Sequence, residues 1–240
     1  GHMRGIWSVV FLPDGEQVIS GSLDGSIRAW RVEDGEQVGT VMKEGSAVMA
    51  VAASSDGRWI ATGGRDRTIT IWNATTHEKV VEMKGHTDWV RSLAFSPDSA
   101  RVVSGLDGRT VIVWSTTTGE RLAGPLKGHT GLALSLAWTP NGQQLIVGCY
   151  KYIKIFDAST GSLLAQWKGH TDFILSIAVS QNGNLFASAS TDHTVRLWDT
   201  AMQQQIGPAL QHDRDVYSVA ISPDGHHLAS GGGDRKVRIW

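Results

Sequence analysis

The stretch GHTDWVRSLAFSPDSARVVSGLDGRTVIVW, residues 85–114, alternates short apolar runs with turns rich in Gly, Asp and Pro. Apolar and β-branched residues favour strands, while Gly, Asp and Pro favour the turns between them. Runs of this length at a spacing of about ten residues are typical of an antiparallel sheet. We therefore expect four strands here, at residues 90–95, 101–104, 110–114 and, more weakly, 121–127.

The same pattern recurs along the whole chain of 240 residues. An aromatic residue closes the third run of each unit at a constant interval of 42 residues: Trp30, Trp72, Trp114, Phe156, Trp198 and Trp240. A fixed period of this length indicates a repeat architecture in which neighbouring sheets bury each other's faces. The repeats span about residues 1–42, 43–84, 85–126, 127–168, 169–210 and 211–240.

Composition excludes several classes of protein. The 22 basic and 23 acidic residues give a net charge of −1, which argues against nucleic acid or an anionic membrane as the main partner. The single cysteine, Cys149, excludes an intrachain disulfide framework. No apolar run approaches the ~18 residues of a membrane-spanning helix.

The residues GHTDWVRSLAFSPD (85–98) and SASTDHTVRLWD (188–199) resemble the WD-repeat β-propeller family. The resemblance covers essentially the whole chain and implies an all-β fold, a β-propeller of six four-stranded blades in a single domain, residues 1–240. The last repeat is short by one strand, so we expect its blade to lack the outer strand and to leave an edge through which the protein could oligomerise. The alternative is that the chain is part of a seven-bladed propeller.

Histidine, serine and aspartate recur with the aromatic residue in several repeats. A hydrolase needs one nucleophile rather than several copies, whereas polar groups between packed sheets need hydrogen-bond partners. The resemblance implies a structural tetrad in each well-formed blade, and we expect no catalytic residue. The expected tetrads are His2, Ser20, Asp24 and Trp30; His170, Ser188, Asp192 and Trp198; and His212, Ser230, Asp234 and Trp240.

The other three repeats depart from this pattern. Repeat two has Glu44 at the histidine position, and repeat three has Asp107 one place early, with Gly108 where the aspartate belongs. Repeat four has Val147 for serine and Phe156 for tryptophan. We expect the fourth blade to pack mainly through apolar contacts and to be locally less rigid.

In the family, loops on one face of the propeller bind partners, and the resemblance carries these positions over to this chain. They are rich in aromatic residues and arginine, which are enriched at protein interfaces. The alternative is that some of these side chains only fill the channel or cover a neighbouring blade. The expected partner-binding residues are Trp7, Met49, Arg65, Trp89, Arg91, Leu132, Phe173 and Tyr217.

These observations predict a non-enzymatic scaffold that binds a protein or peptide, without nucleic acid, membrane, metal or cofactor. Arg65 and Arg91, together with Lys151, would favour an acidic or phosphorylated peptide. Two rival hypotheses remain: the partner-sensing part of a larger signalling or nucleotide-switching protein, and a propeller enzyme. The absence of an export or targeting signal predicts an intracellular location, cytoplasmic first, with the nucleus left open.

Overall fold

The computed structural model describes residues 1–107, 110–126 and 132–240. These residues form β-strands and turns, with no helix in the part of the chain that is described. The strands fall into two compact units, Gly1–Pro125 and Leu126–Trp240, which we describe separately. The expectation that one domain spans residues 1–240 stays a prediction.

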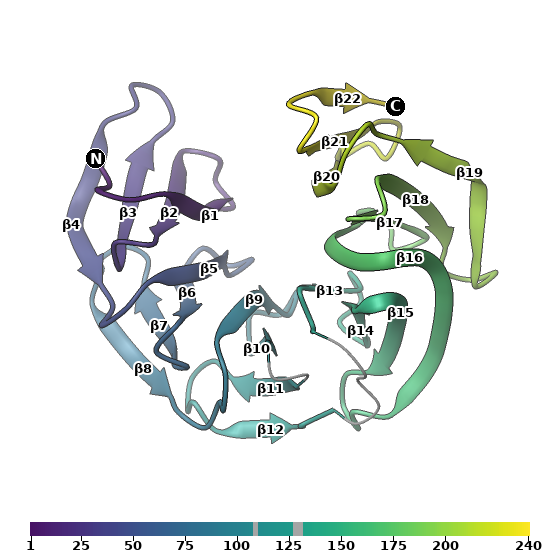
Figure 1. Ribbon diagram of the computed structural model, residues 1–240. Coiled ribbons are helices and arrows are strands. Elements are labelled where there is room, and N and C mark those ends of the chain that lie inside the picture. The colour runs from purple at the N-terminus through teal and green to yellow at the C-terminus, as the bar shows by residue number, and fades with distance from the viewer. Residues whose placement is uncertain (108–109, 127–131) are drawn as a thin grey trace. The chain divides into compact units, whose positions relative to one another are not determined.

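The first unit contains three antiparallel sheets of four strands, each taken in chain order from the first strand to the outer one (Figure 1). Each sheet corresponds to one of the first three repeats. The strands are β1 (Ile6–Phe11), β2 (Gln17–Ser22), β3 (Ser26–Arg31), β4 (Gln37–Lys43), β5 (Val48–Ala53), β6 (Trp59–Gly64), β7 (Ile69–Asn73), β8 (Lys79–Met83), β9 (Val90–Phe95), β10 (Arg101–Leu106), β11 (Val111–Ser115) and β12 (Arg121–Ala123).

The second unit contains a seven-stranded sheet with the order β13 to β19 and a three-stranded sheet β20–β21–β22. Strand β16 is shared by two repeats, because it pairs with β15 along its first half and with β17 along its second half. The strands are β13 (Ser135–Trp138), β14 (Gln144–Gly148), β15 (Tyr150–Asp157), β16 (Leu163–Val179), β17 (Leu185–Ser190), β18 (Thr194–Asp199), β19 (Gln204–Gln211), β20 (Val216–Ile221), β21 (Leu228–Gly232) and β22 (Val237–Ile239).

The strands of the third repeat agree closely with the sequence prediction. Strand β9 has the predicted bounds, and β10 and β11 differ from theirs by one or two residues. The fourth strand is shorter than predicted, because β12 ends at Ala123. Gly124 then adopts a positive φ of 105°, and Pro125 has no N–H to continue a ladder. Residue 127, the predicted end, lies outside the described residues.

Buried apolar side chains connect each sheet to the next within a unit. In the first unit, Ile19 and Ile27 of repeat one share a core cluster with Val48, Ile60 and Trp72 of repeat two. A four-stranded sheet exposes two faces, and stacking it on its neighbour removes one of those faces from water. The turns that connect the strands are thereby held on a fixed base.

Serine hydroxyls add a polar link between the first strands of neighbouring repeats. The amide of Val51 donates to Ser8 Oγ over 3.2 Å. In the second unit the amide of Ile177 donates to Ser135 Oγ over 2.8 Å, and that of Val219 donates to Ser176 Oγ over 3.2 Å. These links fix the position of one sheet along the next, so that loops from successive repeats keep their spacing.

The sixth repeat has three strands within the residues of this sequence, as predicted. Among the strands that the structure describes, β22 is hydrogen-bonded to β21 alone. Oligomerisation through the other edge of β22 stays a prediction.

Candidate partner-docking site

A chain of hydrogen bonds runs through the fifth repeat from the core to the loops. Trp198 Nε1–H donates to Ser188 Oγ over 2.8 Å, and Ser188 Oγ lies 2.7 Å from His170 Nε2. His170 Nδ1 lies 2.9 Å from Asp192 Oδ2. A carboxylate only accepts, so the histidine carries its proton on Nδ1 and accepts a hydrogen bond from the serine hydroxyl at Nε2.

Asp192 also stabilises the turn in which it lies. Its carboxylate accepts from the Thr171 amide over 2.9 Å and from the hydroxyl of Thr194 over 2.6 Å. Burial alone would raise the pKa of Asp192, but the hydrogen bonds from His170, Thr194 and Thr171 outweigh it and hold the pKa well below its usual range. The carboxylate is therefore ionised at neutral pH and fixes two loop segments on the histidine.

The sixth repeat has the same chain. Ser230 Oγ accepts from Trp240 Nε1 over 2.8 Å and lies 2.8 Å from His212 Nε2, and His212 Nδ1 lies 3.0 Å from Asp234 Oδ2. Burial would raise the pKa of Asp234, but hydrogen bonds from the Lys236 amide, His212 and Arg238 lower it to about 2. The predicted tetrads of repeats five and six are thus brought together residue by residue.

The first repeat inserts one more hydroxyl into the chain. His2 Nε2 lies 2.7 Å from Ser20 Oγ, which accepts from Trp30 Nε1 over 2.7 Å. His2 Nδ1, however, is 2.8 Å from Ser26 Oγ and 3.6 Å from Asp24. Ser26 bridges His2 and Asp24, because its hydroxyl donates to Asp24 Oδ1 over 2.6 Å. The sequence reading missed Ser26, although Thr194 at the same position was a signal.

The second repeat replaces the histidine–aspartate pair by a carboxylate–lysine pair. Trp72 Nε1 donates to Thr62 Oγ1 over 2.8 Å, and Thr62 donates to Glu44 Oε1 over 2.6 Å. Lys79 on β8 lies 3.3 Å from Glu44 Oε2 and neutralises it. Asp66 takes no part in this chain and accepts from the Thr68 amide over 3.2 Å. The sequence reading did not identify Lys79, which comes from the outer strand.

In the third repeat the chain of hydrogen bonds ends at the histidine. Trp114 Nε1 donates to Ser104 Oγ over 2.9 Å, and Ser104 Oγ lies 2.9 Å from His86 Nε2. His86 Nδ1 is buried and has no hydrogen-bond partner among the described residues. Burial lowers the pKa of His86 to about 4. Gly108, which stands at the expected aspartate position, lies outside the described residues.

The fourth repeat has an apolar core where the others have the polar chain. Val147 and Phe156 are both fully buried. The histidine of this repeat, at position 129, lies outside the described residues, so the expected loss of rigidity stays a prediction. Lys154, which the sequence reading did not single out, is also buried on β15.

The serine hydroxyls of these chains are buried and already hydrogen-bonded. Ser188 and Ser230 lie in the interior, and each is already bonded to a tryptophan N–H and a histidine. The described residues contain no group of three or more His, Cys, Asp or Glu side chains placed to hold a metal ion. They also contain no helix long and apolar enough to cross a membrane.

Arg65 follows the end of β6, Trp89 precedes β9, and Arg91 lies at the start of β9; together they form a stacked cluster that we call the arginine–tryptophan stack. The guanidinium carbon of Arg65 lies 4.7 Å from the centre of the Trp89 ring, and that of Arg91 lies 5.3 Å from it. Arg91 Nε donates to Asp107 Oδ1 over 2.8 Å. The displaced aspartate of repeat three thus bonds to Arg91 beside Trp89 and not to His86.

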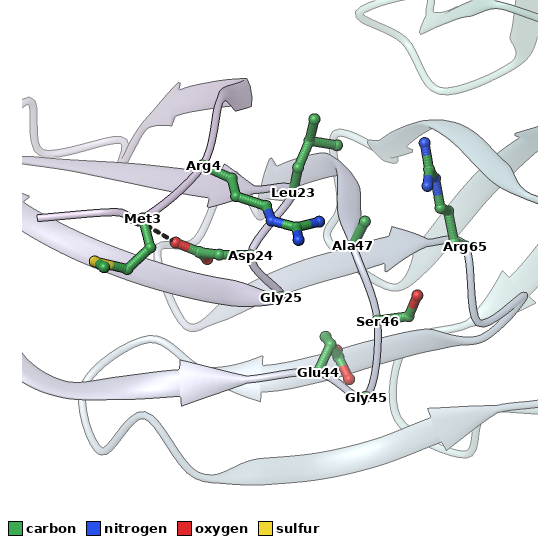
Figure 2. Close-up of a pocket in the computed structure, with 10 residues that line it drawn as sticks. All are labelled: Met3, Arg4, Leu23, Asp24, Gly25, Glu44, Gly45, Ser46, Ala47 and Arg65. Carbon is green, nitrogen blue, oxygen red and sulfur yellow. Dashed lines mark hydrogen bonds between the residues drawn. The ribbon is translucent and has the colours of Figure 1, made fainter.

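A groove of about 520 Å³ adjoins Arg65 between the loops of repeats one and two. Figure 2 shows Arg4 and Leu23 on its repeat-one side, Arg65 on its repeat-two side, and Ser46 and Ala47 between them. We call it the repeat 1–2 groove. Because Arg65 belongs to both features, the groove and the arginine–tryptophan stack form one continuous surface within the first unit.

The other predicted partner-binding residues differ in exposure. Trp7 and Tyr217 are each 57% exposed, whereas Met49 is 3% exposed and presents no free side chain. Leu132 is half-buried. Phe173 is also half-buried, and its ring centre lies 4.9 Å from that of Tyr150. Lys151 Nζ lies 4.6 Å from the centre of the Tyr150 ring. The second unit therefore has a smaller aromatic–cation cluster of its own.

Comparison with known proteins places the chain in a family. The family described as "WD domain, G-beta repeat" matches residues 1–31, 35–73, 77–115, 120–157, 161–199 and 206–240. The chain is 36% identical over 62 residues to the intraflagellar transport protein 122 homolog of Homo sapiens, covering 26% of this chain and 5% of that protein.

Two shorter matches reach other relatives. The chain is 41% identical over 58 residues to the serine-threonine kinase receptor-associated protein of Gallus gallus, covering 24% of this chain and 15% of that protein. It is 40% identical over 47 residues to the lissencephaly-1 homolog of Caenorhabditis briggsae, covering 20% and 12%. In each case the chain spans less than a sixth of the relative's length. The family match extends over all six repeats, and the chain belongs to the WD40 repeat family.

Proposed function

We propose that this chain is a non-enzymatic scaffold that docks a protein or peptide on the loops of its WD repeats. The arginine–tryptophan stack carries the proposal. Its tryptophan and arginines are the residue types that dominate binding energy at interfaces. The stack rests on buried sheets, so little conformational entropy is lost when a partner binds there. WD40 repeat proteins are usually protein-interaction scaffolds, which agrees with this assignment.

The test compares two tryptophans whose rings each contact an arginine, one near each end of strand β6. The Trp89 ring contacts Arg65, which follows the end of β6. Trp59 begins β6, and its ring centre lies 5.1 Å from the guanidinium carbon of Arg58. We expect proteins captured from a native extract by the wild type to be lost with Trp89→Ala and retained with Trp59→Ala. Thermal unfolding of both variants checks that each is folded. An unchanged set of captured proteins with Trp89→Ala would refute the site.

Tyr217 tests whether the second unit contributes to the same function. Its ring is exposed on β20, and we expect Tyr217→Ala to weaken capture without lowering the melting temperature. Retention of all partners by this variant would confine docking to the first unit. Hydrolysis assays with and without divalent metal test the rival proposal of a propeller enzyme.

A second candidate is that these repeats are the partner-sensing part of a larger protein. It is favoured by the relatives, because the matched segments make up 5–15% of their length. Sequencing the encoding transcript beyond both ends decides between the two. We also propose an intracellular location, cytoplasmic first, consistent with relatives named for intraflagellar transport and nuclear distribution. A fluorescent fusion of the full-length protein tests this.

A further inference from the structure

We propose that the repeat 1–2 groove binds the anionic side chain, phosphate or carboxylate, of a docked peptide between Arg4 and Arg65. This inference rests on the proposed docking function and specifies the chemistry of the partner. Both arginines line the groove from opposite sides (Figure 2). Guanidinium groups bind carboxylates and phosphates through paired, charge-assisted hydrogen bonds, which are about twice as strong as neutral ones.

The availability of the arginines distinguishes the groove from the rest of the surface. Arg91 is already neutralised, because its Nε donates to Asp107 over 2.8 Å. Neither Arg4 nor Arg65 forms an ion pair with any described residue. Arg65 is exposed and in contact with the Trp89 ring, which leaves its N–H groups open to a ligand. An anion would therefore bind at the groove rather than at Arg91.

The two carboxylates that line the groove are occupied by internal partners. Asp24 accepts from the Met3 amide over 2.6 Å and from the amide and hydroxyl of Ser26 over 2.8 and 2.6 Å. Glu44 accepts from Thr62 and pairs with Lys79, and its side chain is only 5% exposed. Since both carboxylates are bonded elsewhere, they do not form ion pairs with Arg4 or Arg65 across the groove.

The loop between the arginines supplies further donors. The N–H groups of Gly45, Ser46 and Ala47 donate to no acceptor among the described residues. Gly25 at φ +82° allows this loop to approach closely, because a Cβ there would lie 3.1 Å from the Ser46 carbonyl oxygen. Backbone N–H groups beside two guanidiniums form a concave site for an anion.

The groove also predicts what lies next to the anion in the partner. Arg65 joins the groove to the face of Trp89, so a residue next to the anionic one in the peptide would contact an aromatic ring. Beyond Trp89 lies the Arg91–Asp107 pair, which is neutral as a whole. The inferred partner is therefore an extended peptide with a phosphorylated or acidic residue next to an apolar one.

Binding is tested on the full chain with synthetic nine-residue peptide pools. Each pool has degenerate flanks and a fixed central phosphoserine, glutamate, glutamine or lysine, and fluorescence anisotropy measures affinity. We expect the phosphoserine and glutamate pools to bind at least about tenfold more tightly than the glutamine and lysine pools. Arg65→Gln or Arg4→Gln should each remove most of that preference. Arg58→Gln, a loss of the same charge outside the groove, should keep it.

Each outcome has a defined meaning. Preference for phosphoserine alone supports a phosphate-specific groove, and preference for both supports a general anion site. Equal binding of the glutamine pool, or a preference that survives in the Arg4→Gln/Arg65→Gln variant, overturns the inference and leaves the docking function standing. Binding of no pool also overturns it, while the Trp89→Ala capture experiment decides the docking function independently. Displacement of the phosphoserine pool by equal concentrations of inorganic phosphate overturns the peptide part of the proposal.

Discussion

The fifth and third repeats contain the same four residue types, yet they use the aspartate differently. In repeat five, Asp192 closes the chain Trp198–Ser188–His170 in the interior and ties down two loop segments. In repeat three, the aspartate comes one residue earlier, and Asp107 pairs with Arg91 beside Trp89. A difference of a single residue along the turn separates a carboxylate that bonds in the core from one that bonds to Arg91 in the arginine–tryptophan stack.

The two repeats therefore differ both in the core and at the surface. His86 is left buried with an unpaired Nδ1, which costs free energy of folding. Asp107 in exchange orients Arg91 against the ring of Trp89. The repeat with the weakest internal polar chain among repeats one, three, five and six thus contributes most to the arginine–tryptophan stack.

The largest expected effect comes from interrupting the complete chain of hydrogen bonds in repeat five. Asp192→Ala should lower the free energy of unfolding by about 3 kcal/mol, because His170 Nδ1, the Thr171 amide and Thr194 Oγ1 all lose their acceptor. Urea denaturation followed by circular dichroism measures the loss. Glu33→Ala, at an exposed position, is the control. A midpoint equal to that of the wild type would show that the chain does not stabilise the repeat.

The next largest expected effect is a pH dependence of folding stability that comes from repeat three, whose chain of hydrogen bonds is incomplete. The pKa of His86 is lowered from 6.5 to about 4, so the unfolded chain binds more protons between these values. The stability contribution of His86 is complete above pH 6.5 and is lost as the pH falls towards 4, by about 2–3 kcal/mol.

Denaturation curves from pH 7 to pH 4 check this effect. His2, whose pKa is also lowered mainly by burial, adds a slope of the same sign, so the difference between wild type and His86→Leu isolates His86. The variant should have the flatter profile, whereas His226→Asn, which removes an exposed histidine, should keep the wild-type slope. Identical slopes in His86→Leu and wild type would contradict a buried neutral His86.

The smallest effect sharpens the contrast between the two aspartates. Asp107→Ala should cost less than about 1 kcal/mol of stability, because Asp107 and Arg91 are partly exposed and screened by solvent. The same variant should weaken partner capture, since Arg91 loses the bond that orients it. Thermal unfolding and capture, run side by side with Asp192→Ala, measure both. A stability loss as large as that of Asp192→Ala would mean that Asp107 also supports the core.

Local pattern predicted most of the fold because the signals lie within a few residues of one another. The alternation in residues 90–95 and the turn at residues 96–99 correspond to β9 and the turn after it. Strand β16 was not expected to run through two repeats. Its continuity depends on pairing between Tyr150 and Phe173, whose rings meet at 4.9 Å, a contact between residues far apart in sequence.

The site was harder to predict because its contacts cross repeats. The chemistry of Arg65 and Arg91 was visible in the sequence, but not that Arg91 is neutralised while Arg65 lies on the ring of Trp89. Lys79 could not be assigned to Glu44 without the pairing of β7 with β8, which places the lysine beside Trp72. When one polar pair replaces another in this way, the new partner does not stand at a fixed distance in the sequence from which it could be recognised.

The serine links between first strands show how the protein tolerates insertions. Ser8 and Ser176 each accept an amide 43 residues further on, whereas Ser135 accepts one 42 residues further on. Repeat four carries one additional residue before this point, and its serine has moved by the same one place. The bond therefore reaches the equivalent amide despite the changed numbering. Loops can thus gain or lose residues during evolution while the sheets beneath them keep their relative positions. The loop surface is therefore free to diversify in what it recognises, although the sheets that support it do not change.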